Sequence, residues 1–167
     1  VEKLIKQGFN IELELVGGGE GKAQKMLETQ INISDPNRDF VKQRDYLPQS
    51  ELPKLLTQAD LFVFASSCEN MPNTLVEAMA AGLPIACSNR GPMPEVLEDS
   101  GVYFDPENPE SIANSIADLI TNPEKRIKLA NRTKELSTKY SWPRCAKDTF
   151  QFVSKIADKA EKESQIG

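Results

Sequence analysis

Residues 60–87 of the chain read DLFVFASSCENMPNTLVEAMAAGLPIAC, and our prediction of the fold starts from this stretch. Residues 61–65 form a short apolar run rich in Phe and Val, which is typical of a strand that is buried on both faces. Residues 66–72 are polar and end in a proline, which predicts a loop. Residues 83–87 form a second apolar run, so we expect a second strand there.

The segment between the two apolar runs has the composition of a helix. Asn73 is a favourable N-cap residue, and residues 74–81 are mostly helix formers. Gly82 suits the position just after a helix, and Pro84 prevents the helix from continuing. Because two buried strands joined by one helix form a parallel βαβ unit, we predict an α/β fold. We expect a Rossmann-like, three-layer α/β/α domain with a mostly parallel sheet.

A ligand site is expected where the first of these strands ends. Ligands of such sheets bind beyond the carboxyl ends of the strands, where residues 66–73 should lie. The N-terminus of the helix offers free N–H groups and a partial positive charge, which suit a phosphate. Glu69 lies on the loop and Glu77 about one turn into the helix, so the two carboxylates can hold groups on either side of that phosphate. The alternative is that Glu69 is a solvated loop residue and that the helix dipole favours Glu77.

The pattern Glu69-x7-Glu77, followed by AMAAGLP at residues 78–84, resembles the signature of retaining, nucleotide-sugar-dependent glycosyltransferases of group 1 (family 4), which have the GT-B architecture. Two glutamates at this spacing are a weak signal alone. The apolar strand before them and the sequence EAMAAGLPI after Val76 make the pattern specific. The resemblance extends over about residues 11–154 and implies the C-terminal half of a GT-B fold.

The resemblance also implies a domain organisation. We expect residues 1–167 to form a single nucleotide-sugar-binding domain, which is a fragment without the N-terminal acceptor-binding domain and without the first strand of its own domain. In the family, the loop after that strand supplies an Arg and a Lys to the donor diphosphate, and no basic pair in this sequence matches them. The implied enzyme is a glycosyltransferase of the hexosyltransferase class, and we expect the isolated fragment to be inactive because its cleft is open to water.

The same resemblance assigns roles in the central stretch, with Glu69 and Glu77 as the catalytic pair. Glu77 would accept hydrogen bonds from both ribose hydroxyls, because a carboxylate offers two oxygens to a vicinal diol. Glu69 would hold hydroxyls of the donor sugar. The backbone N–H groups expected to meet phosphate are those of Asn73, Thr74 and Leu75, and those expected to approach the sugar are those of Asn70 and Met71.

The loop departs from the family at one point. Many relatives have Gly-Phe-Gly where this chain has Asn70-Met71-Pro72. Since Pro72 has no N–H group, one donor of the loop is lost, and the sugar specificity is expected to differ from that of those relatives.

Residues 17–21, with the sequence GGGEG, follow a predicted strand at residues 11–16 and precede a predicted helix. This arrangement suits a phosphate, but Lys22 stands where a dinucleotide-binding fingerprint requires glycine. In the resembled family the matching loop lies near the donor, which makes Gly18 and Gly19 candidate site residues. The alternative is a tight turn without a ligand.

A nucleobase site is expected after the strand predicted within residues 40–46. Asp45 stands where the family usually has glycine. In the family, backbone groups just after that glycine hold the base, so Tyr46 and Leu47 are candidates. Alternatively, Tyr46 is a partly buried aromatic residue at a strand end.

Residues 88–95 (SNRGPMPE) are similar to a Gly-x-x-Glu segment that helps to close the site in the family. Glu95 is a candidate ligand contact or, alternatively, a carboxylate that favours a helix start. Arg90 is the only strongly basic group close to the site in sequence, and it can pair with one of the nearby glutamates rather than with phosphate. The remaining predicted elements are a strand at 101–104 and helices at 1–7, at 50–58, opened by Ser50, at 109–120, at 122–139 and from 141 onward.

The composition excludes several classes of function. The net charge of −5 lacks the basic footprint of a nucleic-acid-binding protein, so we expect no nucleic-acid partner. The absence of histidine removes histidine-based triads, general bases and metal sites. Three cysteines fit no metal motif and no disulfide framework, which indicates a reduced, cytoplasmic protein. No apolar run approaches the ~20 residues of a membrane span.

We expect no metal site and no cofactor. The D-x-D motif that is common in metal-dependent glycosyltransferases is absent, and the nucleoside-diphosphate sugar, a UDP-, GDP- or ADP-sugar, is a substrate. There are three alternatives. One is a glycosidase that uses the two carboxylates as acid and base. Another is a non-catalytic, nucleotide-binding or regulatory GT-B-like module. The third is a simple Rossmann dehydrogenase, which the mismatch of the glycine pattern at Lys22 disfavours.

Overall fold

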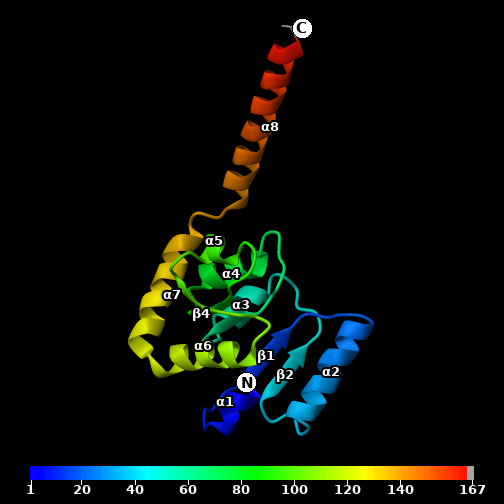
Figure 1. Ribbon diagram of the computed structural model, residues 1–167, viewed down its shortest axis with the longest axis vertical. Coiled ribbons are helices and arrows are strands. Elements are labelled where there is room, and N and C mark those ends of the chain that lie inside the picture. The colour runs from blue at the N-terminus through cyan, green and yellow to red at the C-terminus, as the bar shows by residue number, and fades with distance from the viewer. Residues whose placement is uncertain (165–167) are drawn as a thin grey trace.

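The computed structural model describes residues 1–164 and the side chains of residues 1–159. Its strands form two parallel sheets (Figure 1). In the first, β1 (Leu13–Val16) pairs with β2 (Val41–Arg44), and in the second β3 (Phe62–Phe64), β4 (Ile85–Ser88) and β5 (Gly101–Phe104) lie in this order. The helices are α1 (Glu2–Lys6), α2 (Lys22–Ser34), α3 (Leu52–Leu56), α4 (Asn73–Ala81), α5 (Met93–Leu97), α6 (Pro109–Thr121), α7 (Pro123–Ser137) and α8 (Trp142–Ser164).

The predicted βαβ unit is confirmed as β3, α4 and β4. The two strands are parallel, with Phe62 opposite Ile85 and Phe64 opposite Cys87. Gly82 ends α4 in the left-handed conformation, with φ of 75°, which a residue without a Cβ atom adopts at little cost.

Side chains of β4 alternate between two apolar clusters, as the two-residue period of a strand requires. Ile85 and Cys87 lie in a cluster with residues of α3, α4 and α5, whereas Ala86 lies in a second cluster with residues of α1 and α6. Helix α7 contributes to both clusters through Leu129 and Leu136. Because helices cover both faces of the sheet β3-β4-β5, the prediction of a Rossmann-like α/β fold with parallel strands is confirmed.

Several local predictions were wrong. Asn73 is the first residue of α4 and not its cap, because Pro72 takes the N-cap position with a non-helical backbone, and no side chain caps the helix. Ser50 likewise does not cap α3, whose N-cap is Glu51. Strand β3 is half-buried and not buried on both faces, since it pairs with β4 alone and forms one edge of its sheet.

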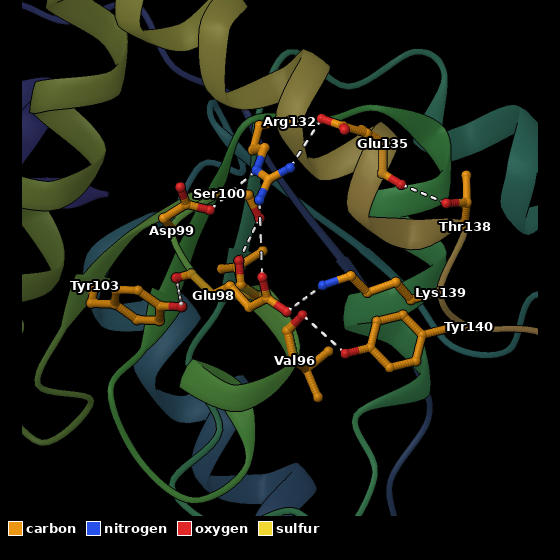
Figure 2. Close-up of polar contacts among 11 residues, drawn as sticks. Val96, Glu98, Asp99, Ser100, Tyr103, Arg132, Glu135, Thr138, Lys139 and Tyr140 are labelled. Atoms are coloured by element: carbon orange, nitrogen blue, oxygen red, sulfur yellow. Dashed lines mark hydrogen bonds and ion pairs between the residues drawn. The ribbon is translucent and has the colours of Figure 1, made fainter.

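A network of polar contacts ties the end of α5 to α7 and to the segment after it (Figure 2). The Tyr103 hydroxyl donates to the Glu98 carbonyl oxygen at 2.6 Å, and Lys139 Nζ donates to Glu98 Oε1 at 2.7 Å. Arg132 Nε donates to Asp99 Oδ1 at 3.1 Å. Burial raises the pKa of Tyr103, so its phenol stays protonated and keeps donating. Glu98, which follows the last residue of α5 in this network, has a φ of 48°, which is unusual for a residue other than glycine.

Helix α8 projects away from the sheets (Figure 1), and all of its described side chains are exposed. Among residues 1–164, no helix combines the length and the apolar composition that crossing a bilayer requires.

The carboxylate of Asp35 organises the turn between α2 and β2. The residue is buried, and its Oδ1 accepts a hydrogen bond from the Asp39 N–H at 2.8 Å. Its Oδ2 accepts from the N–H groups of Phe40 at 3.0 Å and Val41 at 2.7 Å. Burial works to raise the pKa of this carboxyl, but the N–H donors outweigh burial and hold the pKa below its usual value.

We expect Asp35→Asn to lower the free energy of unfolding at neutral pH, because an amide cannot accept from all these N–H groups with both of its terminal atoms. The folded pKa lies below the unfolded value of about 3.9, so this carboxylate contributes stability above that value. The contribution is lost as the pH falls through the folded pKa. Denaturant titrations of both proteins over a descending pH series measure the difference, and a difference that does not shrink in acid would contradict the prediction.

Candidate functional site

The loops that follow β3, β4 and β5 meet at one edge of the sheet, because the strands are parallel. The Ser67 hydroxyl, after β3, donates to Glu107 Oε1, after β5, at 2.5 Å. Arg90, after β4, donates from Nη2 to Asp105 Oδ1 at 3.1 Å. A Cβ atom placed on Gly91 would lie 3.9 Å from the Glu69 carbonyl oxygen. The predicted loop is therefore held beside segments that lie far from it in sequence.

The start of α4 offers one free backbone donor from the predicted set. The Asn73 N–H donates to the Met71 carbonyl oxygen at 2.9 Å, and the Leu75 N–H donates to that of Pro72 at 3.0 Å. The Thr74 N–H makes no hydrogen bond to any part of the chain that the structure describes. Of the three amides, that of Thr74 is thus the one that can meet a phosphate without first breaking an internal bond.

Glu69 and Glu77 are both half-buried. Within the described residues, neither carboxylate forms a hydrogen bond or an ion pair. Glu77 lies on α4 next to the helix face whose Leu75, Ala78 and Met79 are buried in the core. A carboxylate that is partly removed from water and has no partner has open acceptor positions for a polar ligand. Both predicted glutamates therefore have the properties of ligand-binding groups.

The remaining loop residues have different surroundings. Asn70 and Met71 are exposed and accessible to a ligand, whereas Pro72 is buried and anchors the loop. Cys68 is exposed and Cys87 is fully buried. Burial raises the pKa of the Cys87 thiol to about 12, so this residue remains an uncharged part of the core.

The other predicted residues form a second set at the carboxyl edge of β1 and β2. A Cβ atom on Gly18 would lie 3.8 Å from the carbonyl carbon and oxygen of Asp45, so the glycine-rich loop lies beside the predicted nucleobase segment. Tyr46 is 81% exposed, which excludes the alternative of a partly buried aromatic residue. Leu47 is half-buried and Gly19 is exposed. No described hydrogen bond or ion pair joins this set to the loop of Glu69.

The positive φ angles in the glycine-rich loop belong to Gly17, at 129°, and Gly21, at 72°. The backbone conformation therefore favours glycine only at the two ends of the loop, at Gly17 and Gly21. The backbone at Gly18 and Gly19 does not require glycine. A Cβ atom at Gly18 would make only ordinary van der Waals contact with Asp45, so space does not require glycine there either.

Asp105, Glu107 and Ser67 were not among the predicted site residues. The available signal was that Asp105 directly follows a strand of a parallel sheet, where ligand sites form. Arg90 pairs with a carboxylate, as considered, but its partner is Asp105 and not one of the glutamates near it in sequence. Glu95 lies exposed in the first turn of α5, as the helix-start alternative requires. In the described part of the chain, no group of three or more Asp, Glu or Cys side chains is arranged to hold a metal ion.

Comparison with known proteins gives the family. Residues 1–136 match the family model described as glycosyl transferases group 1. The chain is 36% identical over 160 residues to spore coat protein SA of Bacillus subtilis, covering 91% of this chain and 42% of that protein. It is 30% identical over 111 residues to O-antigen chain mannosyltransferase B of Escherichia coli, covering 66% of this chain and 29% of that protein.

Solved structures show the same fold. Sucrose-phosphate synthase from Thermosynechococcus elongatus superposes with a TM-score of 0.82 at 21% identity, over 94% of this chain and 41% of that one. HepE from Anabaena, in complex with UDP and glucose, superposes with a TM-score of 0.81 at 22% identity, over 92% of this chain and 43% of that one. This chain therefore spans less than half the length of these relatives. It belongs to the group 1 glycosyltransferases, and its Rossmann-like fold is the one found in GT-B enzymes.

Proposed function

We propose that this chain is the donor-binding domain of a retaining glycosyltransferase, which transfers a sugar from a nucleoside diphosphate to an acceptor hydroxyl. The observation that carries the proposal is the composition of the segment that leads into α4, where two half-buried carboxylates without partners, Glu69 and Glu77, precede and follow the free Thr74 amide in the sequence. Family membership supports it, as does the fold shared with HepE, which binds UDP and glucose in its own structure.

In this proposal the two glutamates divide the donor between them. Glu77 accepts hydrogen bonds from the ribose hydroxyls, and Glu69 accepts them from hydroxyls of the sugar. The Thr74 N–H and the N-terminal end of α4 face the diphosphate, where the helix dipole favours negative charge. The exposed residues Asn70 and Met71 present their backbone to the sugar.

The chemical task of such a site is to stabilise the leaving group. In the transfer, the bond between the anomeric carbon and the diphosphate oxygen breaks, and a bond to the acceptor oxygen forms on the same face of the sugar. The diphosphate leaves with the bonding electrons, and its oxygen takes up the proton that the acceptor hydroxyl loses. Donors that are already oriented toward the developing charge, such as the Thr74 N–H, stabilise that state without rearrangement.

The second set of residues is proposed to hold the base. Gly18 lies beside Asp45, and the highly exposed ring of Tyr46 follows directly. An exposed aromatic face next to free backbone groups can stack on a nucleobase and hydrogen-bond to its edge. UDP, GDP and ADP sugars are all compatible with this description.

We also propose that the two sheets are parts of one sheet in the full-length protein. The Rossmann order of strands is 3-2-1-4-5-6. The order β2-β1 matches places 3 and 2, and the order β3-β4-β5 matches places 4, 5 and 6. This assignment puts one further parallel strand between β1 and β3. We propose that the full-length protein supplies this strand together with a separate acceptor-binding domain, and that this chain alone binds donor without transferring it.

We expect calorimetric titration with UDP, GDP and ADP to show selective binding of one of them. Glu77→Ala should weaken that binding by about tenfold or more, because hydrogen bonds to a charged group are lost. Glu124→Ala, which removes an exposed glutamate without an ion pair from the first turn of α7, is the matched control.

Unchanged affinity in Glu77→Ala would remove this residue from the site. Failure of the folded chain to bind any of the three nucleotides would overturn the donor-binding proposal. Binding without transfer by the full-length protein would instead favour a regulatory, nucleotide-binding module.

We further propose that donor binding needs no metal ion, because the chain lacks both the D-x-D motif and histidine. Nucleotide affinity is therefore expected to be the same in EDTA as in magnesium chloride at matched ionic strength. A large loss of affinity on chelation, restored by Mg²⁺ or Mn²⁺, would contradict metal independence.

A further inference from the structure

We infer that Arg90 is a phosphate-binding residue of the donor site, and that Asp105 holds its side chain while no donor is bound. This inference rests on the proposed function, since it names a further contact to the same donor. The other groups of the proposed donor site are carboxylates and neutral backbone amides, so Arg90 would be its cation.

The backbone of Arg90 is fixed at the edge where the donor is proposed to bind. The Asn89 N–H donates to the Phe104 carbonyl oxygen at 2.9 Å, and the Arg90 N–H donates to Ser88 Oγ at 3.2 Å. On the other side, Gly91 lies against the Glu69 carbonyl oxygen. The backbone of Arg90 therefore lies between the loop of Glu69 and the loop that follows β5.

The charge of this edge creates a need for a cation. The carboxylates of Asp105 and Glu107 lie in loops at the same edge as Glu69, and the chain carries a net charge of −5. A diphosphate brings further negative charge, which repels these groups unless a cation compensates it. In the loops after β3, β4 and β5 (residues 65–72, 89–92 and 105–108), Arg90 is the only lysine or arginine.

The ion pair with Asp105 leaves the Arg90 guanidinium available to bind a phosphate. Its contact to Asp105 uses one nitrogen at 3.1 Å, and its side chain is 51% exposed. Exposed ion pairs of this kind contribute little free energy. A guanidinium that binds two oxygens of a phosphate gains more, because the contact is bidentate and charge-assisted. Exchange from Asp105 to a donor phosphate is therefore favourable.

Asp105 has a second function that survives this exchange. Its Oδ1 also accepts the Glu107 N–H at 3.1 Å. The turn after β5 therefore keeps one of its hydrogen bonds when Arg90 leaves, and the loop need not rearrange for the donor to bind.

The test uses two variants that break the same ion pair, one by removing its cation and the other by removing its anion. Arg90→Met removes the cation and should lower the affinity for the bound nucleoside diphosphate by about tenfold or more. Asp105→Asn keeps an oxygen for the Glu107 N–H, removes the competing charge and should raise that affinity. Arg90→Lys should fall between wild type and Arg90→Met, because a lysine keeps the charge but not the bidentate geometry.

Arg144→Met is the matched control. Arg144 also makes one exposed ion pair, to Asp148 at 3.6 Å, but both partners belong to α8 and not to the loops after β3, β4 and β5. Its loss should leave nucleotide affinity unchanged. Thermal denaturation of every variant checks that each one is folded at the temperature of the titration.

The outcomes separate this inference from the proposed function. Opposite effects of Arg90→Met and Asp105→Asn support the assignment of Arg90. Equal losses in both variants would show that the pair only maintains the loops, and no change in Arg90→Met would remove Arg90 from the site; either result overturns the inference. Failure of the wild-type chain to bind UDP, GDP or ADP would instead overturn the proposed function.

Discussion

Parallel hydrogen bonding of β3, β4 and β5 is the constraint on which the rest of this structure depends. All four residues of β4 are buried, and the strand pairs with β3 on one side and with β5 on the other. Its backbone N–H and C=O groups are cut off from water and therefore need these two neighbouring strands as hydrogen-bond partners. Because all three strands point the same way, their carboxyl ends and the loops that follow them lie at one edge. The loops that carry Glu69, Arg90 and Asp105 therefore lie at the same edge, and Arg90 contacts Asp105 there.

The same constraint explains why the proposed donor site lies at the N-terminal end of α4. A helix that returns the chain between two parallel strands must begin near the carboxyl end of the first one, and its N-terminal amides therefore point toward the shared edge. The buried face of α4 fixes the rotation of the helix, and that rotation leaves Glu77 half-buried beside the core. The carboxylate is thus held by packing and not by a polar partner, which leaves its oxygens free for a ligand.

Polar contacts at the opposite edge of the sheet, where β5 begins, hold the helix α5 in place. The contacts of Glu98 and Asp99 with α7 and Lys139 hold the end of α5 (Figure 2), and the start of the same helix follows Gly91 beside the loop of Glu69. Each of these surface contacts contributes little by itself. Together they connect the C-terminal end of α5 to α7 and to the segment that follows it.

The sequence predicted the elements of the fold well, because short apolar runs, Gly82 and the prolines are local signals that act within a few residues. The glutamate pair was recognised for the same reason, since both residues belong to one loop and one helix. The N-cap was mistaken because it depends on the backbone of Pro72, which composition does not reveal.

Only the tertiary structure decided which groups are partners and which are free. Arg90 and Asp105 are separated by 15 residues and lie after different strands, so their contact follows from strand order and not from spacing. The freedom of the Thr74 amide likewise depends on where its neighbours' hydrogen bonds go. The sequence by itself determined the α/β class and the position of the glutamates. Folding determined the charge balance of the site, because electrostatic contacts depend on distance in space, which the parallel sheet sets.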